Sequence, residues 1–236
     1  MVTAPPAPGD GPKHRTLQSM NLARAIERRL EGLLDGLAAR MFTGALHPAE
    51  LADRLVREAD LAETVGDRGP VTANRYVIAV NPRHLPEDSH RRTVAEGLAA
   101  VLEDVAAERG WRLEGPVEVE LVGDPDLTAA TVRCTSEVVP GRRPPWARLV
   151  GSGLDVPLVH NRVLIGRSPR CDAVVPDDSV SRRHALLWRE GGRVQVEDLD
   201  SANGTTVDGR PVEGPAVVEP GSVLGLGAIS LRFEPR

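Results

Sequence analysis

The chain has 236 residues, of which 41% are hydrophobic and 27% are charged, and its formal net charge is −5. This length suits two ordinary domains, and the composition is that of a soluble globular protein. The negative charge argues against general attraction to nucleic acids or to membrane surfaces.

The lysine and cysteine content excludes several classes of protein. Lys13 is the only lysine in the chain, whereas P-loop NTPases, nucleotide kinases and pyridoxal-phosphate enzymes need a lysine inside the fold. Cys134 and Cys171 lie in different halves of the chain, so we expect free thiols, with no disulfide framework and no zinc site. We expect no cofactor and no bound metal.

The N-terminal segment, residues 1–17, is rich in proline and glycine and lacks apolar periodicity, which predicts a disordered tail. It lacks the charged start and apolar stretch of a signal peptide, and no run of about 18 apolar residues occurs in the chain. We therefore expect a cytoplasmic protein without direct membrane insertion.

Residues 18–137 carry alternating helical and strand patterns. Apolar residues at three- and four-residue steps predict a long helix over 20–41, and because its polar face mixes acids and bases we expect it in a protein core and not on a membrane surface. A second helix is expected to start at Pro48, which suits the first helical position. A third helix, with an apolar stripe from Val94 to Val105, is expected to be capped by Gly110.

Strand patterns alternate with these helices. The segment 71–80 is rich in β-branched residues, and 117–122 alternates valine and leucine with glutamate. After the turn "GDPDL", the segment 128–138 is expected to pair back as the hairpin partner of 117–122. The result is an α+β domain whose strand–helix–strand unit is long enough for a parallel crossover.

A proline- and arginine-rich linker is expected over 138–148. Prolines prevent regular structure there, and we expect the arginines to keep the segment solvated. Trp146 is expected to pack as an anchor against the following domain.

From 149 to 236 the helical periodicity disappears. Short apolar runs are separated by Gly, Pro, Asn, Asp and Ser turns, a spacing typical of an all-β antiparallel sandwich. The polar clusters of this region fall at the turns, where a rigid β frame normally displays binding groups.

Three of these turns carry complementary donors. Arg167 follows Gly166, Ser181 and Arg182 follow "DDSV", and Asn203 begins a tight turn. If the loops converge at one end of the sandwich, they offer guanidinium, hydroxyl and carboxamide groups around one concavity. A phosphate monoester matches that set, because it carries about two negative charges and accepts bidentate arginine hydrogen bonds.

The stretches "IGR", "SVSRRH" and "DLDSANGTTVDG" resemble, in this order, the motifs of the forkhead-associated (FHA) domain over residues 149–235. The resemblance implies a phosphothreonine-peptide binder that is not an enzyme. It assigns phosphate contacts to Arg167 and Ser181, a further contact to Arg182, and a hydrogen bond to the peptide backbone to Asn203. It assigns structural support of the site to Gly166, His184, Gly204 and Thr205.

One position departs from the commoner FHA pattern. Ala202 stands where many FHA domains have a threonine or serine before the asparagine, so the preference for residues around the phosphothreonine cannot be carried over. Arg170, Arg183 and Arg210 either help to select flanking residues or are solvated surface groups, with the surface role favoured.

A catalytic interpretation is disfavoured. Ser181 and His184 could form a nucleophile–base pair, but neither an orienting carboxylate nor a nucleophile elbow accompanies them. The other histidines lack ligand spacing.

The stretches "LHPAELADRLVREAD", "NRYVIAVNP" and "GWRLEGPVEVEL" resemble the N-terminal domain of FhaA-type actinobacterial proteins, over residues 17–137. That family carries no known enzymatic signature. Its members usually have a long disordered linker, so the short linker here predicts domains that are held close together.

The expected function is that of an adaptor in bacterial Ser/Thr kinase signalling. By resemblance, its partners are Thr-phosphorylated kinase substrates, including proteins of cell-wall synthesis or division. The alternative is a structural scaffold that assembles through the N-terminal domain, with phosphate-independent FHA contacts. A further hypothesis is that Thr16, beside Arg15 in the tail, becomes phosphorylated and serves as an internal or neighbouring ligand.

Overall fold

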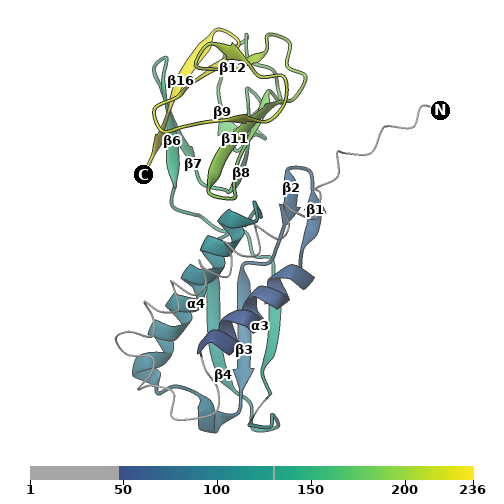
Figure 1. Cartoon of the computed structure of the whole chain (residues 1–236), viewed down its shortest axis with the longest axis vertical. Helices are drawn as coiled ribbons and strands as arrows, with labels where there is room; N and C mark the ends of the chain where they lie inside the picture. Colours follow the sequence, from purple (N-terminus) through teal and green to yellow (C-terminus); the bar gives the residue numbers. More distant parts are fainter. Residues whose placement is uncertain (1–47, 130) are drawn as a thin grey trace, which may run out of the picture.

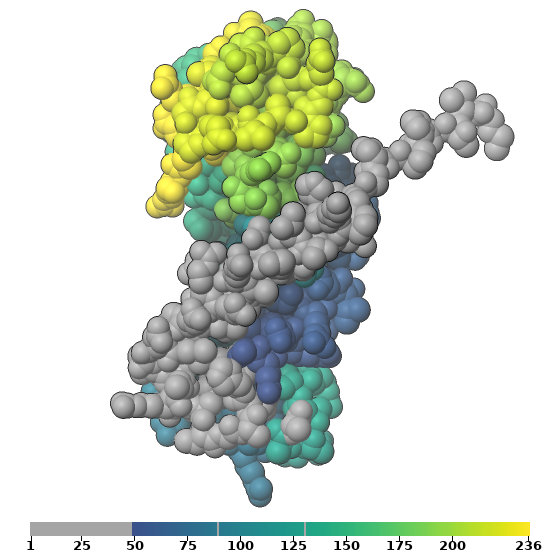
Figure 2. All heavy atoms as spheres, viewed as in Figure 1, coloured from purple at the N-terminus to yellow at the C-terminus, as the bar shows by residue number. Residues whose placement is uncertain are grey.

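The computed structural model describes residues 48–129 and 131–236, which form an α+β body and a β-sandwich stacked along the long axis of the molecule (Figure 1). The tail over 1–17, Thr16 and the helix expected over 20–41 lie outside the described residues. Figure 2 shows the C-terminal sandwich, in green and yellow, at one end of the molecule. The expected two-domain architecture is confirmed.

Within the described residues, the N-terminal body places two helices on a three-stranded sheet. Helix α3 spans Pro48–Leu61 and helix α4 spans Asp88–Glu108, preceded by the short 3-10 helix η2, Pro82–His84. Strand β3, Arg75–Val80, pairs in parallel with β4, Glu118–Gly123. The expected parallel crossover through the α4 helix is therefore confirmed. Helix and strand residues share one apolar core, in which Tyr76 and Trp111 are the largest side chains.

The prediction that 117–122 and 128–138 pair as a hairpin is wrong. Strand β5, Arg133–Glu137, pairs antiparallel with β3, so the sheet order is β4–β3–β5. The physical reason is burial: β3 contributes the most buried residues of the three strands, and pairing on both sides satisfies all its backbone groups. The more exposed β4 and β5 occupy the edges.

A short hairpin precedes β3. Strands β1, Thr64–Gly66, and β2, Gly69–Val71, are joined by the turn Asp67–Arg68. The strand expected over 71–80 is therefore interrupted. The Thr72 hydroxyl donates a hydrogen bond to the Ala59 carbonyl at 2.6 Å. This bond holds the irregular segment between β2 and β3 against helix α3.

Within the described residues, the C-terminal body is a sandwich of a five-stranded and a six-stranded sheet, as expected. The first sheet has the order β14–β11–β10–β8–β9 and the second β13–β12–β15–β16–β6–β7. Their bounds are β6 Ala147–Gly151, β7 Leu154–Leu158, β8 Arg162–Gly166, β9 Ala173–Val174, β10 Ala185–Glu190, β11 Arg193–Asp198, β12 Thr205–Val207, β13 Arg210–Pro211, β14 Ala216–Val217, β15 Val223–Leu226 and β16 Ile229–Pro235. Inward-facing residues of both sheets form a single core.

Trp146 anchors the start of the sandwich. Its ring packs edge-on against Phe233 with the ring centroids 6.0 Å apart, and its indole N–H donates to the His160 carbonyl at 2.8 Å. The anchoring role expected from the sequence is confirmed.

The expectation that the linker arginines stay solvated is wrong for Arg143. Its side chain is 5% exposed and pairs with Glu103 of α4 at 2.7 Å. It also donates to the Gly115 carbonyl of the first domain and to the Val159 carbonyl of the second. The linker is therefore fastened to both bodies.

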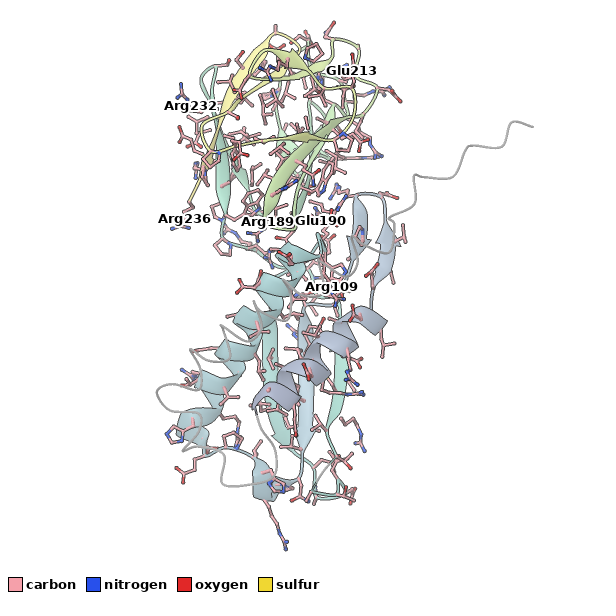
Figure 3. The ribbon with its side chains drawn as sticks, viewed as in Figure 1. Arg109, Arg189, Glu190, Glu213, Arg232 and Arg236 are labelled. Carbon is pink, nitrogen blue, oxygen red and sulfur yellow. The ribbon has the colours of Figure 1, made fainter. Side chains whose placement is uncertain are left out.

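A buried ion-pair network crosses between the two bodies. Arg112 of the first domain is 3% exposed at its side chain and donates to both carboxylate oxygens of Asp172 in the sandwich, at 2.9 and 3.2 Å. Arg68 of the β1–β2 turn donates to the same carboxylate at 2.9 Å. Figure 3 shows Arg109, Arg189 and Glu190 gathered at this junction. The short linker thus joins domains in direct contact.

Both cysteines are free and buried. Among the described helices, none combines the length and the apolar character that crossing a membrane requires.

Candidate functional site

The first loop of the expected site starts at Gly166, the last residue of β8. A Cβ atom at this position would lie 2.5 Å from the Arg182 carbonyl oxygen, so only glycine allows the second loop to pass this closely. The Arg167 backbone N–H donates to the Ser181 carbonyl at 3.0 Å. The structure therefore places the exposed Arg167 directly beside Ser181.

His184 joins the second loop to the third. It is fully buried, its Nδ1 accepts from the Ser181 backbone N–H at 3.0 Å, and its Nε2 lies 3.1 Å from the Gly204 carbonyl. A backbone N–H can only donate, so Nδ1 must be the unprotonated nitrogen, and Nε2–H donates to Gly204. The neutral Nε2–H tautomer locks Ser181 and Gly204 together.

The Ser181 hydroxyl is oriented by the third loop. Its Oγ accepts the Ala202 backbone N–H at 3.0 Å, which leaves the hydroxyl hydrogen for an outside acceptor. Any residue except proline can supply a backbone N–H at position 202, so the alanine there keeps this contact and removes only a side-chain hydroxyl.

Asn203 lies exposed at the tip of the third loop. Its side-chain amide donates to the Ser179 carbonyl at 2.8 Å, and its Oδ1 accepts no hydrogen bond in the part of the chain that the structure describes. Gly204, with φ of +76°, makes the turn behind it, and the Gly227 N–H donates to the Gly204 carbonyl at 3.2 Å. The carboxamide is fixed and keeps an acceptor available.

Asp198 shapes the third loop, a role the sequence did not reveal. Its carboxylate accepts from the Ser201 N–H and hydroxyl and from the buried Thr205 hydroxyl, the last at 2.5 Å. Partial burial alone would raise the pKa of Asp198, but hydrogen bonds from Thr205 and Ser201 outweigh burial and hold the pKa below its usual value. The spacing Asp-x-x-Ser was the available signal.

Asp177 and Ser179 support the second loop and were also missed. Asp177 accepts from the Ser179 N–H and hydroxyl, and the Ser179 Oγ accepts from the Ala228 N–H at 2.9 Å. A Cβ atom on Gly227 would lie 2.4 Å from the Ser179 carbonyl oxygen. The Asp-x-Ser pattern signals such a turn, but the approach of the distant Gly227 has no local signature.

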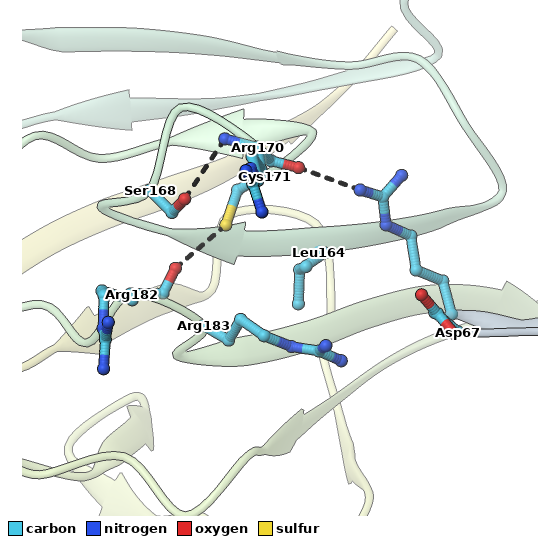
Figure 4. A pocket seen from close by; sticks show the side chains of 8 residues that line it. Asp67, Leu164, Ser168, Arg170, Cys171, Arg182 and Arg183 are labelled. Atoms are coloured by element: carbon cyan, nitrogen blue, oxygen red, sulfur yellow. Dashed lines mark hydrogen bonds between the residues drawn. The ribbon is translucent and has the colours of Figure 1, made fainter.

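The guanidinium groups on and beside these loops lack acidic partners. Among residues 48–129 and 131–236, no carboxylate lies within 4.0 Å of the side-chain nitrogens of Arg167, Arg170, Arg182 or Arg183, whereas Arg112 and Arg143 are both paired. Arg182 differs from Arg167 in position, since it is one of the residues that line a hollow beside the loops (Figure 4). The loops therefore present unneutralised positive charge around Ser181 and Asn203.

Two family models match the chain. One, described as "FhaA, N-terminal domain", matches residues 23–135, and the other, described as "FHA domain", matches residues 163–227. The chain is an FHA-domain protein with an FhaA-type N-terminal domain. All eight residues expected to form or support the site lie inside the FHA match.

Related proteins carry the same domain. The glycogen accumulation regulator GarA of Mycolicibacterium smegmatis is 44% identical over 68 residues, which are 29% of this chain and 42% of GarA. The FHA domain-containing protein FhaB of Mycobacterium tuberculosis is 36% identical over 84 residues, 36% of this chain and 54% of FhaB. This FHA protein thus spans about half the length of the curated relatives it matches.

A solved structure from a study of phosphothreonine-dependent FHA domain interactions is 33% identical. The match covers 38% of this chain and 94% of that one, with a TM-score of 0.35.

Proposed function

We propose that the FHA loops bind phosphothreonine peptides and that the chain is a non-enzymatic adaptor. The observation that supports this most directly is the pairing of an unneutralised Arg167 with a Ser181 hydroxyl whose hydrogen is free. Both groups sit on loops held in place by the buried His184. A prearranged site binds without the entropic cost of ordering its loops.

Each side chain has a distinct role in this proposal. Arg167 donates to two phosphate oxygens, and Ser181 donates its hydroxyl hydrogen to the phosphate. Arg182 adds positive charge from the next position. The Asn203 carboxamide hydrogen-bonds the peptide backbone, which fixes the register of the ligand and carries no information on its sequence. Gly166, His184, Gly204 and Thr205 hold these groups in position.

The partners in this proposal are Thr-phosphorylated substrates of bacterial Ser/Thr kinases, with proteins of cell-wall synthesis or division as the specific candidates. Relatives of the chain are named as a regulator of glycogen accumulation and as inhibitors of oxoglutarate dehydrogenase. Partners in central metabolism are therefore included in the same search. Capture of phosphoproteins from native lysate on the intact chain, followed by mass spectrometry, identifies them.

The binding test uses a fluorescent phosphothreonine peptide library titrated against the intact chain and the variant Arg167→Ala. Loss of a bidentate charge-assisted contact should weaken binding roughly 10- to 100-fold, which corresponds to about 1.5–3 kcal/mol. Fluorescence anisotropy measures the Kd.

Arg232→Ala is the matched control, because Arg232 is an exposed arginine on β16 (Figure 3). Strand β16 belongs to the six-stranded sheet, whereas Arg167 follows β8 of the five-stranded sheet. Its Kd should equal that of the wild type. Binding that is indifferent to the phosphate, or that survives Arg167→Ala, would contradict the proposal. Such phosphate-independent binding would favour the scaffold alternative instead.

A further inference from the structure

A hollow of about 420 Å³ lies between the N-terminal domain and the FHA loops (Figure 4). Asp67 and Arg68 of the β1–β2 turn form one wall, and Arg170, Arg182 and Arg183 of two FHA loops form the others. In Figure 4, Arg183 extends toward the side of the hollow formed by the β1–β2 turn. The hollow is thus built by both domains.

The charges around the hollow are unbalanced. Arg68 is neutralised by Asp172 and also donates to the Arg170 carbonyl at 2.9 Å. The side chains of Arg170, Arg182 and Arg183 have no ion-pair partner among the described residues, and the one lining carboxylate belongs to the exposed Asp67. A chain with a net charge of −5 therefore concentrates positive charge here.

The hollow adjoins the proposed phosphothreonine site. Arg182 lines the hollow and directly follows Ser181, and its carbonyl accepts from the Ser168 N–H at 3.3 Å and from the Cys171 thiol at 3.1 Å. Those bonds fasten the two FHA loops to each other. Arg68 is held by the buried Arg112–Asp172 network, so the opposite wall is also fixed.

We propose that this hollow is an anion subsite that binds a second acidic side chain of the same phosphopeptide. The proposal rests on the proposed function, since the phosphothreonine is what places the peptide beside the hollow. Clustered guanidinium groups select phosphate or carboxylate oxygens, and Asp67 tempers the attraction. The N-terminal domain thereby takes part in ligand selection by the FHA domain.

The test compares peptides that carry one phosphothreonine with otherwise identical peptides that carry a second acidic residue. A glutamate or a second phosphothreonine is placed in turn at each position within about five residues, because an extended peptide advances about 3.3 Å per residue. Each peptide is titrated against the intact chain by fluorescence anisotropy. At the position that reaches the hollow, affinity should rise about five- to tenfold.

Two substitutions test whether the hollow is the source of this gain in affinity. One removes a positive charge from its lining and the other removes a negative charge. Arg183→Ala should abolish it, and Asp67→Asn should enlarge it by about two- to threefold, because a repelling charge is removed. Neither variant should change the Kd of the singly phosphorylated peptide, and Arg232→Ala should change neither value. If glutamate raises the affinity, the subsite accepts acidic side chains of either kind. If only the second phosphothreonine raises it, the subsite is specific for phosphate.

The absence of any gain, or a gain that survives Arg183→Ala, would overturn the subsite. A gain that Asp67→Asn leaves unchanged would overturn the contribution of the N-terminal domain. If the singly phosphorylated peptide itself fails to bind, the proposed function has failed, and this outcome is distinct from the other two.

Discussion

At the scale of single residues, His184 explains how the exposed binding groups of the FHA loops are held in fixed positions. The imidazole is fully buried and satisfies one backbone donor and one backbone acceptor from two different loops. Burial of these groups would be costly without it, because an unpaired buried polar group loses its hydration and gains nothing in return.

Replacing His184 by alanine should therefore lower both stability and affinity. We expect the free energy of unfolding to fall by about 2–4 kcal/mol, because a buried side chain is removed, the Ser181 N–H loses its acceptor and the Gly204 carbonyl keeps only the Gly227 N–H. Phosphopeptide affinity should fall as well, since Ser181 and Asn203 are no longer held together. Urea unfolding and anisotropy measure the two effects, and His90→Ala on α4 is the control. A variant with unchanged Kd would show that His184 does not organise the site.

At the scale of elements, the turn between β7 and β8 links stability to pH. His160 in this turn donates from Nδ1 to the Leu113 carbonyl of the other domain at 2.8 Å. Burial lowers the pKa of His160, and the positive charge of Arg112 acts in the same direction, against the Leu113 hydrogen bond and the nearby carboxylates. The folded chain thus takes up a proton at this imidazole less readily than the unfolded chain does.

The lowered pKa of His160 determines how the stability of the folded chain depends on pH. Below the ordinary histidine pKa of 6.5 the unfolded chain takes up a proton that the folded chain resists, so stability should decrease as the pH falls further. The variant His160→Asn retains a donor for Leu113 but cannot titrate. Thermal unfolding between about pH 7.5 and 5 should show a shallower decline for this variant than for the wild type. Equal declines would refute the role of His160.

Helices and strands with a local apolar pattern were predictable from the sequence. Which strands pair with each other was less predictable. The helices at Pro48 and around Leu98, the strand ending at Val80 and the alternation of the sandwich strands follow from apolar periodicity, which is a property of consecutive residues. The pairing of β5 with β3 depends on which strand is most buried, and the run of apolar residues in β3 was the available signal.

The β1–β2 hairpin had almost no such signal. Val65 is 92% exposed, and the three residues of β2 are all partly buried, so neither strand shows an alternation of buried and exposed side chains. Its fixed position comes from Arg68 and Asp172, which are 104 positions apart. In the site, the order of motifs predicted Arg167, Ser181 and Asn203 on adjoining loops, but the approach of Gly227 to Ser179 arises only after folding.

At the scale of the whole molecule, Asp172 connects the two domains. Its carboxylate accepts from Arg68 and Arg112 of the N-terminal domain and from the Leu164 N–H of its own domain. Its side chain is 8% exposed and that of Arg112 is 3% exposed. Removing the charge of Asp172 takes a carboxylate partner from both arginines and leaves Arg112 paired with Glu114 alone, at 2.6 Å.

Asp172→Asn should therefore separate the unfolding of the two domains. We expect a loss of about 1.5–3 kcal/mol from the coupled structure, because charge-assisted hydrogen bonds between the domains are weakened while Arg112 keeps Glu114. Calorimetry should then resolve two transitions where the wild type shows one. Asp178→Asn, at an exposed position of the same domain, should leave the wild-type trace unchanged. A single unshifted transition in Asp172→Asn would show that the network does not couple the domains.

The fastening of Arg143 to both domains fixes how the FHA loops are presented to a ligand. A flexible tether would let one domain search a volume around the other. With Arg143 bonded to Glu103, Gly115 and Val159, the N-terminal domain instead keeps one position beside the FHA loops. A peptide that reaches these loops therefore meets the same face of the N-terminal domain at every encounter.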